Sequence, residues 1–222
     1  MTMMVRGAAL ALLAALASSG ANAAEAKSTL VLPGGNGEIL TLVLPPGWTR
    51  SFAGTEGGTT VVEWRPTDPA KAGDGRITVT RIGGLGGSDP ADFIRESAEA
   101  LKQDCDDVVQ GQVRTDRDGS VRTALGCTRR KSDSQGEMQL LHIAVGREAI
   151  YVARRIWPLA AYDKAHIPLS SVQIADGGAD IDALRLCSLS GIGTACPTEL
   201  ASAVRGKITD LSPLELKGAA LP

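Results

Sequence analysis

Aromatic residues are scarce in this chain of 222 residues, which has three Trp, two Tyr and two Phe. Proteins that bind single-stranded nucleic acids stack the bases on aromatic side chains, so this composition disfavours that class. The charge balance agrees, because 23 basic residues against 25 acidic ones leave no basic excess for nucleic acid or an anionic membrane. We expect neither as the main partner.

Long apolar runs are also absent. The longest, residues 8–17, is shorter than the roughly 18 apolar residues that a membrane helix needs, so no membrane span is expected after signal removal. This run follows Arg6 and precedes the small residues Ala21 and Ala23, which is the pattern of a secretory signal peptide. The sequence predicts a signal peptide over 1–23 and a periplasmic or secreted protein. Its removal leaves 22 basic against 25 acidic residues.

Cysteine is limited to four residues, all beyond the predicted signal peptide. An even number of cysteines in an exported chain favours disulfides. Three pairings are possible and the sequence alone does not choose among them, but Cys105 with Cys127 and Cys187 with Cys196 is favoured because each pair closes a short segment. A zinc site needs short spacings such as C-x-x-C, which do not occur, and we predict no metal and no cofactor.

Recognisable catalytic motifs are missing. Neither G-x-S-x-G nor H-E-x-x-H occurs, and the chain has only two histidines, His142 and His166. A hydrolase would need one of them beside a carboxylate in a cleft, and a redox protein would need a strained, exposed disulfide. A non-catalytic protein is the favoured interpretation, and these two classes stay open as alternatives.

The clearest helix signal covers Pro90–Cys105. Apolar and small side chains recur there on one stripe, Asp89 suits the N-cap, and Pro90 suits the first helical position. The glycine-rich stretch before it, residues 83–87, matches neither G-x-G-x-x-G nor G-K-[ST]. We therefore interpret that stretch as a flexible connection between a strand and the helix, and not as a phosphate-binding loop.

β-Branched and alternating segments predict strands over most of the remaining chain. We expect hairpins over 30–44, 107–130 and 136–158, further strands over 59–66 and 75–83, and short helices over 159–165, 180–189 and 198–206. The predicted fold is a single α+β domain over 24–207, in which an antiparallel sheet packs against one long helix. A short, disulfide-stapled helical extension follows, and 208–222 are expected to be a loosely docked or disordered tail.

The hairpin over 136–158 carries the candidate site. With Gly146 and Arg147 as a two-residue loop, one face is apolar and the other is amphipathic, with His142 opposite Tyr151, and a four-residue loop would keep the same faces. We name His142, Tyr151, Arg155 and Trp157 as candidate ligand- or partner-binding residues, because they could present a cation and hydrogen-bond donors to a small anion or an acidic side chain. In the alternative interpretation, a helix covers this face.

Three segments together resemble the PsbP-like family of extrinsic photosystem subunits and their bacterial periplasmic relatives. They are LTLVLPPGW at 40–48, DPADFIRESAEAL at 89–101, and AIYVARRIW at 149–157. The resemblance covers about 30–168, and the segment beyond departs from it. It implies an antiparallel sheet packed against helices, in proteins that act as binding or assembly accessories. The expected function is therefore an exported, non-catalytic binding or accessory protein, whose partner is an envelope protein or a small ligand.

Overall fold

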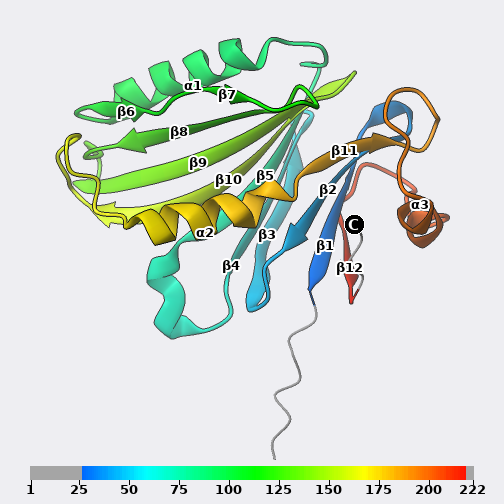
Figure 1. The fold of residues 1–222 in the computed structure, drawn as a ribbon, viewed down its shortest axis with the longest axis horizontal. Coiled ribbons are helices and arrows are strands. Elements are labelled where there is room, and N and C mark those ends of the chain that lie inside the picture. The colour runs from blue at the N-terminus through cyan, green and yellow to red at the C-terminus, as the bar shows by residue number, and fades with distance from the viewer. Residues whose placement is uncertain (1–26, 219–222) are drawn as a thin grey trace, which may run out of the picture.

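The structure is a computed structural model that describes residues 27–218, so the predicted signal peptide lies outside the described residues. Two antiparallel sheets and three α-helices make up the α+β fold (Figure 1). No helix in the described part of the chain is both long and apolar enough to cross a membrane.

The larger sheet has eight strands, in the order β3-β4-β5-β10-β9-β8-β6, with β7 also paired to β8. Their central hairpin, β9 and β10, is the longest and confirms the hairpin predicted over 136–158. The strands are β3 (Trp48–Glu56), β4 (Thr59–Pro66), β5 (Arg76–Gly83), β6 (Val108–Gln110), β7 (Arg114–Thr115), β8 (Val121–Cys127), β9 (Gln135–Val145) and β10 (Ala149–Ala160).

The second sheet was not expected as a separate unit. It has four strands in the order β11-β2-β1-β12, and it contains the predicted N-terminal hairpin. The strands are β1 (Ser28–Pro33), β2 (Glu38–Leu44), β11 (Arg185–Ser188) and β12 (Leu214–Lys217). Two expectations are corrected here. β11 replaces part of the helix predicted over 180–189, and β12 pairs with β1 within the segment expected to be a loose tail, because Leu214 and Leu216 pack against the apolar cluster of Val31 and Ile39.

α1 (Pro90–Asp104) confirms the strongest helix prediction, including Asp89 as the N-cap, whose side chain accepts a hydrogen bond from the Ala91 N–H. It lies over one face of the larger sheet and buries Ile94 and Ala98 against strands β8, β9 and β10 (Figure 1). The N-cap fixes where the helix starts, and the apolar stripe fixes which side it buries.

The prediction of one long helix is not confirmed, because a second helix, α2 (Ser171–Asp182), packs on the opposite face of the larger sheet. Two adjacent glycines hid it from the sequence reading, since glycine is a poor helix former. Gly177 is needed for packing, as a Cβ there would lie 2.3 Å from the Trp157 ring. The sequence signal for α2 is at its start, where Ser170 and Gln173 form a capping box.

The remaining helices are α3 (Thr198–Val204), as predicted, and the short 3-10 turns η1 (Gly35–Gly37) and η2 (Pro69–Asp74). The helix predicted over 159–165 is wrong, because these residues form the end of β10 and a loop.

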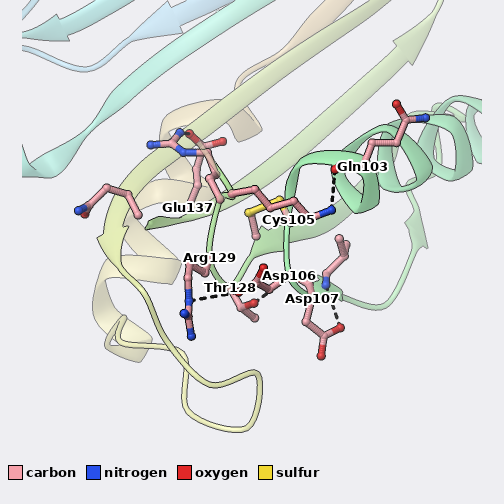
Figure 2. The surroundings of a disulfide bond; sticks show 12 residues. Gln103, Cys105, Asp106, Asp107, Thr128, Arg129 and Glu137 are labelled. Carbon is pink, nitrogen blue, oxygen red and sulfur yellow. Dashed lines mark hydrogen bonds and ion pairs between the residues drawn. A yellow bond between two sulfur atoms is a disulfide. The ribbon is translucent and has the colours of Figure 1, made fainter. Parts of the chain in front are cut away.

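Both favoured disulfides are present. Cys105–Cys127 ties the end of α1 to β8, and Cys187–Cys196 ties β11 to the segment before α3. Around the first bridge, the Arg129 side chain forms an ion pair with Asp106 (Figure 2). The Asp106 N–H also donates to the Arg129 carbonyl, and the Thr128 N–H donates to the Asp107 carbonyl. The bridge therefore lies within a backbone-paired junction and closes the end of the helix onto the sheet.

Removing the first bridge should destabilise the fold. In the Cys105→Ala, Cys127→Ala double variant, the unfolded chain is no longer closed into a loop and gains conformational entropy. The free energy of unfolding should therefore fall by about 3 kcal/mol. Removing Cys187–Cys196 should cost less, because that bridge spans 9 residues and the first spans 22. Urea unfolding of both double variants measures this order, and a larger loss from the shorter bridge would contradict it.

Candidate functional site

The register of the central hairpin differs from the prediction by two residues. Val145 pairs with Ile150 and His142 lies opposite Ala153, so the turn contains 146–149 and the predicted pairing of His142 with Tyr151 is wrong. A shift of two residues preserves the face on which every side chain lies, because side chains in a strand alternate with a period of two. His142, Tyr151, Arg155 and Trp157 therefore share one face, as predicted.

That face is covered and forms no open concave surface. His142 and Tyr151 are 0% exposed, Trp157 is 3% exposed and Arg155 is 5% exposed. α2 and the four-stranded sheet lie over it, and Tyr151 is part of the same apolar cluster as Leu30 and Leu42 (Figure 1). The alternative interpretation, a covering helix, agrees with this arrangement. A ligand-binding role for the four residues stays a prediction, and each of them has internal contacts.

Arg155 is a buried structural cation. Its Nε donates to Asp180 Oδ2 of α2 at 3.0 Å, and its guanidinium lies 4.7 Å from the ring centres of both Trp48 and Trp157. Burial lowers the pKa of Arg155, and the Asp180 carboxylate opposes that shift. The indoles and the carboxylate take the place of solvent around the charge, which fixes α2 on the sheet.

His142 connects α2 to the β7–β8 turn. Its Nδ1 lies 3.0 Å from the Ile181 carbonyl and its Nε2 lies 3.0 Å from the Ser120 hydroxyl. Because a carbonyl only accepts, Nδ1 carries the proton and Nε2 of the neutral ring is an acceptor. The Ser120 hydroxyl has a single proton, and it can donate that proton either to His142 Nε2 or to Asp118 Oδ1. Burial lowers the pKa of His142, which favours this neutral form.

The contact between Ser120 and His142 resembles that between a serine nucleophile and its general base, but the surrounding carboxylates disfavour nucleophilic catalysis. Its hydroxyl also lies 2.7 Å from Asp118 Oδ1, and Asp116 Oδ2 lies 3.8 Å from His142 Nε2. An acyl-transfer site needs hydrogen-bond donors where an oxyanion develops, whereas carboxylates stand here. His166, the other histidine, is exposed in a loop. Its backbone N–H donates a hydrogen bond to the Asp163 carbonyl.

Tyr151 reaches a carboxylate that sequence reasoning missed. Its hydroxyl donates to Glu38 Oε1 at 2.8 Å, and the Arg147 N–H donates to Glu38 Oε2 at 2.8 Å. Burial, then the Glu38 carboxylate, raise the pKa of Tyr151. Glu38 thus ties the start of β2 to the β9–β10 turn. A Cβ at Gly146 would lie 2.1 Å from Glu38 Oε1, so the turn requires glycine for this approach. Glu38 and Tyr151 are 113 residues apart, so no local sequence pattern could predict their contact.

A pocket of about 610 Å³ opens beside Glu38, and we call it the end pocket. Segments remote in sequence form it, namely η1 with the start of β2, the β5–α1 loop, the β7–β8 turn, the end of β9 with the β9–β10 turn, and the stretch from Leu184 through β11 into the loop that Cys187–Cys196 closes. Its lining includes Asn36, Glu38, Asp118, Ser120, Gly146, Arg147, Leu184, Leu186, Ser188, Ile192 and Thr194. Of the predicted site residues none lines it directly, but His142 and Tyr151 hold Ser120 and Glu38, which do.

Two further features bear on ligands. Within residues 27–218, no group of His, Cys, Asp and Glu side chains is arranged to hold a metal ion. The loop over the end pocket exposes apolar side chains, since Ile192 is 55% exposed and Leu189 is 41% exposed. Its position is held by the Leu189 N–H, which donates to the Gly37 carbonyl, and by the Ser190 hydroxyl, which donates to the Asn36 carbonyl at 3.0 Å.

No family model and no curated protein matches the chain. Among solved structures, it is similar to the solution structure of cyanobacterial PsbP (CyanoP) from Synechocystis sp. PCC 6803, with 15% sequence identity and a TM-score of 0.43. The match covers 77% of this chain and 98% of that one. At this identity the likeness concerns the fold alone.

His142 predicts a loss of stability in mild acid. Burial lowers its pKa below the ordinary value of 6.5, so over the interval between the two values the unfolded chain binds a proton that the folded chain does not. The free energy of unfolding should therefore fall as the pH is lowered below 6.5. Urea unfolding across pH should show a shallower slope for His142→Gln, and the wild-type slope for His166→Gln. Equal slopes in the wild type and His142→Gln would contradict the assignment.

Proposed function

We propose that the protein is an exported, non-catalytic accessory protein of the cell envelope, and that the end pocket and its disulfide-closed loop bind a partner protein. The observation that carries this proposal is the loop over 188–195, which holds exposed Ile192 at the mouth of the end pocket. The signal-peptide pattern and two disulfides support export, because structural disulfides persist in oxidising compartments.

The chemistry of the loop favours a protein partner. Exposed apolar side chains such as Ile192 and Leu189 can form the apolar centre of an interface, while Asp118 and Arg147 supply polar groups at its rim. Because the disulfide and two hydrogen bonds already hold the loop, binding would order few additional groups.

The non-catalytic part of the proposal rests on how the reactive groups are arranged. The imidazole of His142 and the hydroxyl of Ser120 bond to each other beside carboxylates. A redox role needs an accessible sulfur, and the first bridge does not offer one, since Cys105 is 3% exposed and Cys127 is 2% exposed. In the second bridge Cys187 is buried and Cys196 is partly exposed, so this argument applies to Cys105–Cys127. These arrangements support a structural role for the His142–Ser120 contact and for the Cys105–Cys127 bridge.

Photo-crosslinking tests the partner site. A photoreactive residue at position 192, in the native host, should yield one recurrent protein adduct that mass spectrometry identifies. The matched control is position 172, because Val172 is also exposed, at 66%, but belongs to the first turn of α2. That end of the helix points away from β11 (Figure 1). Equal adducts from both positions, or none from position 192 in a folded and exported protein, would overturn the proposed site.

Export makes a separate prediction. The protein purified from the periplasm or medium should begin at Ala24, because removal of the signal peptide is expected after Ala23. Intact mass measurement after alkylation without reductant should find no modified cysteine, because all four are paired. A cytoplasmic chain that retains 1–23 would contradict the export part alone and leave the partner site to its own test.

A further inference from the structure

A second hollow lies on the face of the larger sheet that α1 only partly covers. It has a volume of about 420 Å³ and runs between α1 and strands β4, β5 and β10. We call it the Arg154 groove. Its polar lining includes Thr78, Thr80, Ser97 and Arg154, and its apolar walls include Val61 and Leu101. A hollow of this size suits a small ligand with an apolar body.

Arg154 has donors that the described residues do not use. Its only hydrogen bond runs from Nη1 to the Thr80 hydroxyl at 3.2 Å, and its guanidinium lies 5.8 Å from the ring centre of Phe93. Within 27–218 it forms no ion pair, although a guanidinium offers five N–H donors in a planar fork. Burial lowers the pKa of Arg154 to about 10, so the group still carries its charge at neutral pH.

The neighbouring arginines show what is missing. Arg155, on the opposite face, pairs with Asp180 at 3.0 Å, and Arg76, in the same groove, pairs with Glu137 at 3.0 Å. Glu137 is the acid whose charge acts on Arg154, but its carboxylate already accepts hydrogen bonds from Arg76, Arg130 and Gln139. A half-buried charge without a counter-charge is costly, and a bound anion would remove that cost.

We propose that the Arg154 groove binds a small aliphatic monocarboxylate, with the carboxylate on Arg154 and the hydrocarbon along the apolar walls. A carboxylate accepts two parallel N–H bonds from a guanidinium, and the Thr78, Thr80 and Ser97 hydroxyls add donors around it. One uncompensated positive charge suits a monoanion, and Asp104 in the lining disfavours a doubly charged phosphate.

This site does not depend on the proposed partner site. The groove lies on the α1 face of the larger sheet, and the end pocket lies at the turns on the side of the four-stranded sheet. The partner proposed for the end pocket can therefore be wrong while the carboxylate site in the Arg154 groove is right, and the reverse also holds. The two experiments test different residues.

Titration calorimetry of the full mature protein with hexanoate tests the proposal, with hexan-1-ol as the uncharged control ligand. Hexanoate should bind, and hexan-1-ol should bind at least tenfold more weakly, which is about the ratio that one charge-assisted hydrogen bond supplies. Equal binding of acid and alcohol, or binding of neither at millimolar concentration, would overturn the proposal without any variant.

Variants then assign the site. Arg154→Gln should weaken hexanoate binding by about tenfold or more, and Arg154→Lys should weaken it less, because it keeps the charge and loses the fork. Arg95→Gln is the matched control, since Arg95 lies on the exposed side of α1 with 64% of its side chain accessible. Thermal unfolding checks that each variant is folded. Wild-type affinity in a folded Arg154→Gln protein would place the ligand elsewhere and refute the assignment.

Discussion

The antiparallel pairing of β10 between β5 and β9 is the constraint on which the rest of the structure depends. Both faces of this central strand are buried, so alternation sends neighbouring side chains into two different environments. Ile150 and Val152 pack under α1, while Tyr151 and Ala153 pack under the four-stranded sheet. The adjacent Arg154 and Arg155 therefore face opposite sides, one toward a groove and the other into a pair of indoles.

Polar contacts, in addition to apolar burial, position the layers on this strand pair. Glu38 accepts hydrogen bonds from the Tyr151 hydroxyl and the Arg147 N–H, His142 joins α2 to the β7–β8 turn, and Asp180 pairs with Arg155. Each contact joins elements far apart in the chain. Buried polar groups need partners, so each contact also restricts how the sheets and α2 can slide against one another. The end pocket exists because these contacts bring turns and strand ends that are remote in sequence to one end of the molecule.

Much of the local structure was readable in the sequence because its signals are local. The capped helix after Asp89, the three hairpins and the facing parity of β9 and β10 all follow from caps, turns and alternation over a few residues. The predictions that failed concern elements stabilised by residues far away in the sequence. α2 was missed because Gly177 looks unfavourable until Trp157 packs on it, and β12 was missed because its partner β1 lies at the other end of the chain.

The sequence by itself determined an α+β chain with four pairable cysteines, a strong helix and an amphipathic central hairpin, because composition and periodicity encode these directly. Only the tertiary structure decided that the amphipathic face of that hairpin is covered as well as the apolar one. That choice depends on α2 and the second sheet, whose docking is set by packing between residues remote in sequence. For the same reason, the pattern of two adjacent arginines could not say that Arg155 has a carboxylate partner in α2 and Arg154 has none among the described residues.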